Sequence, residues 1–96
     1  MKLRYTRPAL ADLDRVLSYL SERSPQGAER VQSRINLLLD LLARHPGIGQ
    51  ATDEPGIRRL VVFPYPYLIY YETAAEEVII HAVRHASRDP SSMPGR

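Results

Sequence analysis

The side chains best suited to chemistry gather near the end of the chain, where histidines and arginines follow one another closely. His81 and His85 lie four residues apart, Arg84 precedes the second histidine and Arg88 follows it. A histidine can take up a proton near neutral pH, and an arginine can stabilise the charge that grows on a phosphate when a ribose 2′-hydroxyl attacks it. His85 with Arg84 and Arg88 could therefore cleave RNA, although any small basic domain contains such a set.

The other chemical patterns in the chain are weak. His81 and His85 would share one face of an extended strand, but no third metal ligand lies nearby and the chain has no cysteine. Gly47-Ile48-Gly49 lacks the third glycine and the Lys-Ser/Thr pair of phosphate-binding loops, and Ser87 lies outside a Gly-x-Ser-x-Gly pattern. We expect neither a metal nor a cofactor.

A second group of candidate residues occupies the middle of the chain. Arg58 and Arg59 are adjacent, so on a strand they point to opposite faces. Four of the six tyrosines fall within residues 65–71. Tyrosine combines an apolar ring with a polar tip, which suits protein interfaces and base stacking, although it is also a common strand residue. The expected partner-binding residues are Arg58, Arg59, Tyr67, Tyr70, Tyr71, His85 and Arg88.

Two helices must precede these residues. Thr6-Arg7-Pro8 and Ser24-Pro25 both place a capping hydroxyl just before a proline, which is typical of helix starts. Apolar residues then recur at helical spacing, which predicts helices over residues 8–22 and 25–45. The short link between them predicts a helical hairpin.

Four strands are expected to complete the fold. Alternation and β-branched or aromatic residues predict strands over 2–6, 57–63, 67–73 and 78–85, with 46–56 as the main loop. The resulting order is β-α-α-β-β-β, an α+β domain with a helical hairpin packed on one face of an antiparallel sheet. We place this single domain at residues 1–90 and expect the turn-rich residues 91–96 to form a flexible tail.

The uncovered face of such a sheet should be polar at alternate positions, and the sequence departs from that pattern. Consecutive apolar or aromatic residues occupy 60–63, 68–71 and 78–80. Contiguous apolar surface usually contacts a partner. We therefore expect a partner protein or self-association, with coverage by the tyrosines of a curved sheet as the alternative.

Composition narrows the classes of function. The chain has 96 residues, of which 44% are hydrophobic and 25% charged, as in a single globular domain. The lack of cysteine fits a cytoplasmic location, and no apolar run approaches the ~20 residues of a membrane span, so we expect no membrane contact. The net charge is only +2, and twelve of the thirteen cations are arginine. This balance permits contact with a polyanion but does not require it.

From residue 2 to about residue 90, the ordered set of patterns resembles the RelE/ParE superfamily of type II toxin–antitoxin toxins, also called plasmid stabilisation proteins. Tyr5-Thr6-Arg7-Pro8-Ala9-Leu10-Ala11-Asp12-Leu13 resembles the family's opening strand and first helix. Ile57-Arg58-Arg59-Leu60, followed by Tyr67-Leu68-Ile69-Tyr70-Tyr71-Glu72, resembles its central hairpin. Val83-Arg84-His85-Ala86-Ser87-Arg88-Asp89 is similar to an ending frequent in the ParE branch.

The resemblance implies a growth-inhibiting toxin that a cognate antitoxin neutralises by wrapping its C-terminal segment around it. Operator DNA would be bound only through the antitoxin complex. ParE-type members are associated with inhibition of DNA gyrase, whereas RelE-type members cut messenger RNA on the ribosome without a metal. The RelE-type hairpin typically carries arginine directly after the tyrosine that Tyr67 matches, and this chain has Leu68 there.

The sequence therefore favours a ParE-like toxin that acts by binding gyrase. One alternative is a ribosome-dependent mRNA endonuclease that uses His85, Arg84 and Arg88. A further alternative is a non-toxic interaction module that only forms complexes with an antitoxin.

Overall fold

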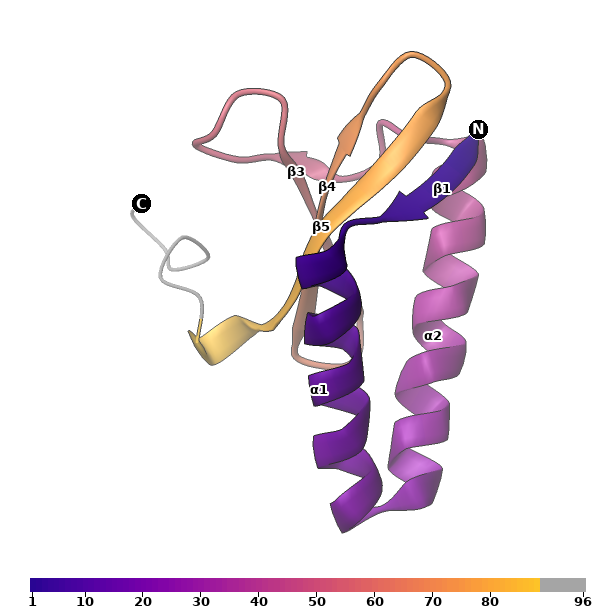
Figure 1. The fold of residues 1–96 in the computed structure, drawn as a ribbon, viewed down its shortest axis with the longest axis vertical. Coiled ribbons are helices and arrows are strands. Elements are labelled where there is room, and N and C mark those ends of the chain that lie inside the picture. Colours follow the sequence, from indigo (N-terminus) through magenta and orange to yellow (C-terminus); the bar gives the residue numbers. More distant parts are fainter. Residues whose placement is uncertain (89–96) are drawn as a thin grey trace.

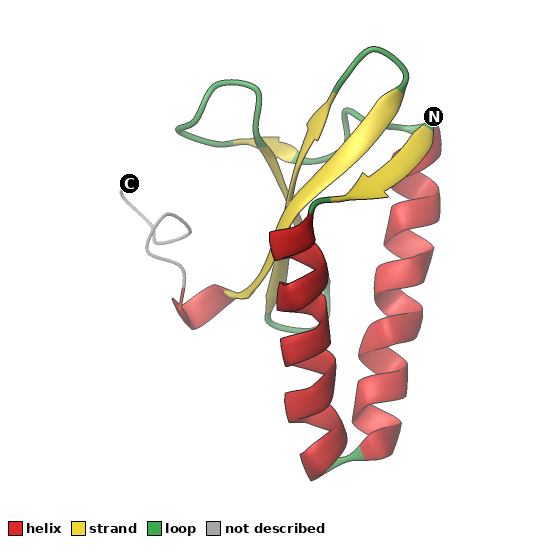
Figure 2. Ribbon diagram, viewed as in Figure 1, coloured by secondary structure: helices red, strands yellow, loops and turns green. Residues whose placement is uncertain are grey.

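The order of the elements along the chain agrees with the sequence prediction. The computed structural model describes residues 1–88, and the predicted tail 91–96 lies outside this part (Figures 1 and 2). The elements are β1 (Lys2–Tyr5), α1 (Arg7–Arg23), α2 (Pro25–Arg44), β2 (Gln50–Ala51), β3 (Arg58–Val61), β4 (Tyr67–Thr73), β5 (Glu77–His85) and a short 3-10 turn (Ala86–Arg88). The two-residue strand β2 was not predicted. No helix in this part of the chain has the length and apolar character to span a membrane.

Both helices begin at the predicted hydroxyl caps. The Thr6 hydroxyl accepts a hydrogen bond from the Ala9 amide at 3.2 Å, and the Ser24 hydroxyl accepts one from the Gly27 amide at 3.0 Å. Each cap satisfies an amide that the first helical turn leaves without a partner. Since Ser24 also ends α1, the two helices form a tight antiparallel hairpin that projects beyond the sheet (Figure 1).

The sheet is mixed rather than wholly antiparallel as predicted. Its strand order is β1-β5-β4-β3-β2, and β1 runs parallel to β5, with Lys2 opposite Glu77 and Tyr5 opposite Ile80. The helical hairpin returns the chain to the end of the sheet where β1 starts. Because β3, β4 and β5 then alternate in direction, β5 must run the same way as β1.

A β-bulge in β5 separates the two histidines that were expected to share a face. Tyr71 lies opposite Ile80 but Tyr70 lies opposite Ala82, so His81 is an extra residue on β5. An inserted residue reverses the alternation of every side chain that follows it. His81 therefore lies beside Glu72, on the opposite face from His85.

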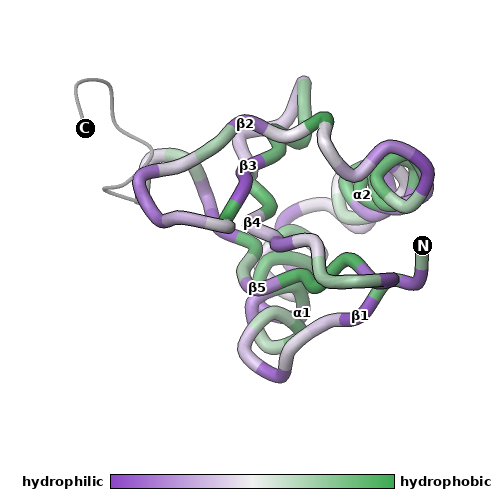
Figure 3. The backbone as a smooth tube through the Cα atoms, turned by 90° about the horizontal axis from the view of Figure 1, so that it is seen from above, coloured by the Kyte–Doolittle hydropathy of each residue, from purple (hydrophilic) through white to green (hydrophobic). Residues whose placement is uncertain are grey.

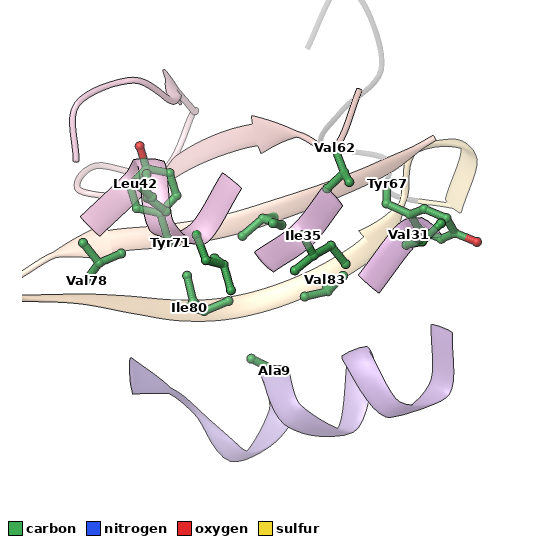
Figure 4. Close-up of a cluster of buried hydrophobic side chains, with 12 residues drawn as sticks. Ala9, Val31, Ile35, Leu42, Val62, Tyr67, Tyr71, Val78, Ile80 and Val83 are labelled. Carbon is green, nitrogen blue, oxygen red and sulfur yellow. The ribbon is translucent and has the colours of Figure 1, made fainter. Parts of the chain in front are cut away.

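The main core fills the space between the helices and one face of the sheet (Figure 4). In Figure 3 the most hydrophilic part of α2 is turned away from the sheet. The fully buried side chains of this core come from α2, from the residue after β3 and from the strands β4 and β5: Ile35, Leu42, Val62, Ile69, Tyr71, Val78 and Ile80. Burial of this face gives the helical hairpin its fixed position, because isolated helices of this length are marginal in water.

The face of the sheet turned away from the helices, here called the outer face, carries a second and smaller cluster. Leu68, Tyr70 and Ala82 are buried there, with Ile57 and Ala86 packed against them. The centre of the outer face is therefore covered, as the sequence alternative allowed. Exposed apolar side chains remain at its margin.

The Tyr71 side chain, which was expected to contact a partner, lies in the main core instead. Its hydroxyl accepts a hydrogen bond from the Gly49 amide at 2.9 Å and donates one to the Pro46 carbonyl at 2.8 Å. Burial raises the pKa of this hydroxyl, although the Gly49 amide and the charge of Arg58 act in the opposite direction. The hydroxyl therefore stays protonated and holds the loop that leads from α2 to β2.

Gly49 is required by the close approach of this tyrosine. A Cβ atom at Gly49 would lie 2.5 Å from the Tyr71 hydroxyl oxygen and 3.0 Å from the Arg59 carbonyl oxygen. The Arg58 guanidinium then donates to the Gly49 carbonyl at 2.7 Å. Arg58 and Tyr71 together fix the loop to the sheet.

Removing the Tyr71 hydroxyl should destabilise the fold. Tyr71→Phe leaves the buried Gly49 amide and the Pro46 carbonyl without their shared partner, which costs about 1–3 kcal/mol. We expect a lower urea midpoint with an unchanged slope. Tyr19→Phe is the matched control, because Tyr19 is exposed. Equal midpoints for the two variants would contradict this role of Tyr71.

Candidate functional site

A groove runs between α1 and the C-terminal part of β5 and has a volume of about 440 Å³. Helix α1 contributes residues three, four and seven positions apart, which lie on one face of a helix. We call it the α1–β5 groove, and it is lined by Asp12, Arg15, Val16, Tyr19, Tyr67, Val83, Arg84, His85 and Ser87. Its floor is largely apolar, and its rim carries two arginines.

Asp12 holds one wall of this groove in place. Its Oδ2 atom accepts a hydrogen bond from the Val83 amide at 3.1 Å, and its Oδ1 atom accepts one from Arg15 at 2.5 Å. Strand β1 pairs with β5 only as far as Ile80. In the described part of the chain, the β5 edge beyond that point has no strand beside it. A side chain of α1 thus satisfies an amide that a longer β1 would have bonded.

His85 faces the groove in a fixed orientation. Its ring meets the Tyr67 ring edge-on, with centroids 5.3 Å apart and an interplanar angle of 86°. Its Nδ1 atom accepts a hydrogen bond from the Ser87 amide at 3.1 Å and lies 2.8 Å from the Ser87 hydroxyl. Because a backbone amide can only donate, Nδ1 is the acceptor in this hydrogen bond.

The outer face presents arginines around a buried tyrosine. Arg59 lies opposite Tyr70 in the sheet, and the Arg84 guanidinium lies 5.8 Å from the centroid of the Tyr70 ring. Arg59 donates to the Gln50 side chain at 3.1 Å. Its Nε atom is buried without a hydrogen-bond partner.

Two exposed apolar residues adjoin these arginines. Val61 is 48% exposed and Phe63 is 70% exposed, whereas Val62 between them is fully buried in the main core. Val61 lies on the outer face, because it pairs with Leu68 in the sheet, and Phe63 lies two residues further along, in the turn that follows β3. We call Arg59, Val61, Phe63 and Arg84 the outer-face patch.

The structure divides the residues predicted to bind partners into separate groups. Tyr67 and His85 lie in the α1–β5 groove, and Arg59 and Tyr70 lie on the outer face. Arg58 and Tyr71 fix the loop at Gly49, as described above. The side chain of Arg88 lies outside the described part of the structure.

Sequence reasoning missed the α1 side of the groove, and it singled out the apolar run over 60–63 without naming Val61 or Phe63 as binding residues. The signal for α1 was a set of polar and aromatic residues at helical spacing outside the leucine stripe: Asp12, Arg15 and Tyr19. The signal for β3 was an apolar run that continues into two prolines, Val61 to Pro66.

Two of the proposed nuclease residues, His85 and Arg84, point to opposite faces of the sheet. His85 faces the helix side of the sheet, while the Arg84 side chain extends over Tyr70 on the outer face and reaches only the rim of the groove. In the described residues, no three histidine or acidic side chains are placed to hold a metal ion. The α1–β5 groove and the outer-face patch thus lie on opposite sides of one sheet.

Comparison with known proteins shows the family of the chain. Residues 3–90 match the family model described as the ParE toxin of the type II toxin-antitoxin system parDE. The chain is 39% identical over 84 residues to Toxin RelE2 of Caulobacter vibrioides, a match that covers 88% of this chain and 93% of the relative. It is 35% identical over 85 residues to the protein Y4kP of Sinorhizobium fredii, covering 88% of each.

A solved structure supports the same relationship. A chain from the chromosomal ParDE TA system of P. aeruginosa superimposes with a TM-score of 0.76 and 25% sequence identity. The match covers 88% of this chain and 95% of that chain. The α+β fold with its helical hairpin on one face of the sheet is therefore shared with a toxin–antitoxin protein.

Loss of the Asp12 carboxylate should loosen the β5 wall of the groove. Asp12→Ala leaves the Val83 amide without its acceptor, which costs about 1–2 kcal/mol. We expect faster hydrogen exchange of the Val83 amide and a lower urea midpoint. Asp14→Ala removes an exposed carboxylate from the same helix and serves as control. Unchanged exchange at Val83 in the Asp12 variant would show that this hydrogen bond does not hold the strand.

Proposed function

The chain belongs to the ParE family of type II toxin–antitoxin toxins, and on this premise we propose that it inhibits growth by binding DNA gyrase. A cognate antitoxin neutralises it, and operator DNA is contacted only through the antitoxin complex. Its place of action is then the cytoplasm, where gyrase works. The family model and the ParDE neighbour support the ParE-like assignment.

The observation that carries a binding mechanism is the state of His85. Its Nδ1 atom is engaged by Ser87, and Arg84 projects mainly to the other face of the sheet. General acid–base cleavage needs a base and a cation directed at the same phosphate. A toxin with this arrangement acts by occupying a surface of its target.

The α1–β5 groove suits the antitoxin. It combines an apolar floor formed by Val16, Tyr67 and Val83 with the end of the β5 edge, which β1 does not cover beyond Ile80 and where Asp12 bonds the Val83 amide. An extended peptide can add main-chain hydrogen bonds to such an edge and place alternate side chains in the adjoining groove. Arg15 and Arg84 on the rim favour a segment that carries acidic residues.

The alternative is a ribosome-dependent mRNA endonuclease. The name of the 39% identical relative, Toxin RelE2, favours it. For this chemistry His85 would have to release Ser87 and turn toward Arg84. Leu68, which lies opposite Arg84 in the sheet, would offer the phosphate no charge. The third candidate is a non-toxic interaction module, which would leave growth unchanged when the chain is expressed.

Expression without antitoxin separates these functions. We expect growth arrest with filamentation and DNA damage, reduced supercoiling by purified gyrase, and unchanged translation in vitro. Coexpression of the small reading frame beside the gene should restore growth. His85→Ala should leave gyrase inhibition within about threefold of the unmodified chain, because truncating most interface residues costs less than 1 kcal/mol.

Two results would contradict this proposal. Cleavage of ribosome-bound mRNA that His85→Ala abolishes would establish the endonuclease instead. Normal growth of cells that contain the folded protein would exclude both toxic functions, and the interaction module would be the candidate that remains.

A further inference from the structure

We propose that Asp12 holds the place of a main-chain carbonyl, and that the antitoxin segment in the α1–β5 groove takes the Val83 amide from it. The segment then lies beside β5 as a further strand of the sheet, in line with β1. This inference rests on the proposed function and deepens it, because it gives the way in which the antitoxin binds at that same groove. The partner is an extended peptide that offers a carbonyl oxygen to the strand edge.

The partners of the β5 edge change from main chain to side chain where β1 ends. The Thr6 amide donates to the Ile80 carbonyl at 3.0 Å, as a residue of a paired strand does. Further along the edge, the Thr6 hydroxyl lies 3.5 Å from the His81 carbonyl oxygen, and Asp12 Oδ2 accepts from the Val83 amide at 3.1 Å. Two side chains at the start of α1 therefore continue the row of acceptors and donors that β1 begins.

The Val83 amide points toward the groove and away from β4. On the other side of the strand, the Ala86 amide donates to the Pro66 carbonyl at 2.9 Å. Main-chain groups of successive strand residues point to alternate edges, so the amides of Val83 and His85 both point to the α1 side. The bond from Val83 to Asp12 agrees with this alternation. A peptide placed along this side can bond both amides, because they repeat at the spacing of a strand.

Asp12 closes this edge in the free chain. Val83 lines the groove and yet is only 3% exposed. A segment that left Asp12 in place would be separated from β5 by the carboxylate and could not bond the Val83 amide. Pairing at this residue therefore requires that the Asp12 side chain withdraw.

The withdrawal leaves neither group without a partner. Asp12 Oδ1 is bonded to Arg15, three residues further along α1, and the Arg15 side chain is 72% exposed. The carboxylate can thus turn toward solvent and keep its arginine, and exposed ion pairs of this kind contribute little to stability. The Val83 amide exchanges one acceptor for another and stays satisfied. Contacts of the segment with the apolar floor then decide the direction of the exchange.

The exchange predicts an unusual effect of Asp12 on binding. A contact that must break when a partner binds lowers the apparent affinity for that partner. Asp12→Ala should therefore destabilise the free chain, as argued above, and bind the antitoxin more tightly. If Asp12 were instead a fixed wall against which the antitoxin packs, its loss would weaken binding.

The test measures antitoxin affinity and identifies the acceptor of the Val83 amide. The probe is the product of the small reading frame beside the gene, titrated into the unmodified chain, Asp12→Ala and Asp14→Ala. Asp14→Ala is the matched control, because it removes an exposed carboxylate from the same helix. The acceptor is found by NMR, from the scalar coupling across the hydrogen bond between the ¹⁵N-labelled chain and a ¹³C-labelled acceptor, either in the chain or in the antitoxin.

We expect Asp12→Ala to bind the antitoxin on the order of threefold to tenfold more tightly than the unmodified chain, as for one hydrogen bond that no longer has to break. Asp14→Ala should match the unmodified chain. The Val83 amide should couple to the Asp12 carboxyl carbon in the free chain and to an antitoxin carbonyl carbon in the complex. If Asp12→Ala does not fold, this coupling decides the question, because it needs no variant.

The opposite results overturn the proposal. A Val83 amide that is still coupled to Asp12 in the complex, or that couples to no antitoxin carbonyl, would show that no exchange takes place. Equal or weaker binding by folded Asp12→Ala would show that Asp12 does not compete with the segment. If the unmodified chain does not bind the antitoxin at all, the proposed function itself fails, and this result is distinct because the others require a complex.

Discussion

Burial of one face of the sheet beneath a helical hairpin is the constraint on which the rest of the molecule depends. Helices α1 and α2 are held by apolar contacts with that face and project beyond it (Figure 1). A sheet covered on one side keeps a second face and two edges for other uses. The outer-face patch and the open part of the β5 edge both follow from this arrangement.

The unequal lengths of the parallel strands create the groove. Strand β1 has four residues and β5 has nine, so β5 extends beyond its neighbour. Helix α1 starts where β1 ends and runs beside this extension. Asp12 then bonds the Val83 amide, which fixes the helix to the strand while leaving the next turn of α1 free to line the groove. The groove therefore leaves the Val83 amide with a hydrogen-bond acceptor, although no strand pairs with β5 at this point.

The sequence predicted both helices and the four longer strands, but it did not show which face of the sheet each side chain of β4 and β5 occupies. Thr6 and Ser24 identified both helix starts because capping depends on local chemistry. The direction of β1 required the pairing of distant segments. The sequence did not reveal the bulge at His81, because an extra residue in a strand has no composition of its own. That residue nevertheless moves every following side chain to the other face of the sheet. For the same reason nothing local distinguished Tyr71, which enters the core, from its neighbour Tyr70, which lies on the outer face.

The same alternation separates the histidine and the arginine that a nuclease mechanism would need together. Arg84 and His85 are adjacent on β5, and adjacent strand residues point to opposite faces. Bringing both to one phosphate would need a helix or a turn at this point, and the 3-10 turn begins only at Ala86. That turn instead places the Ser87 amide against His85 Nδ1, which accepts its hydrogen bond. Alternation within β5 thus assigns the histidine to one surface and the arginine to the other, and the turn after β5 adds the Ser87 contact to the histidine alone.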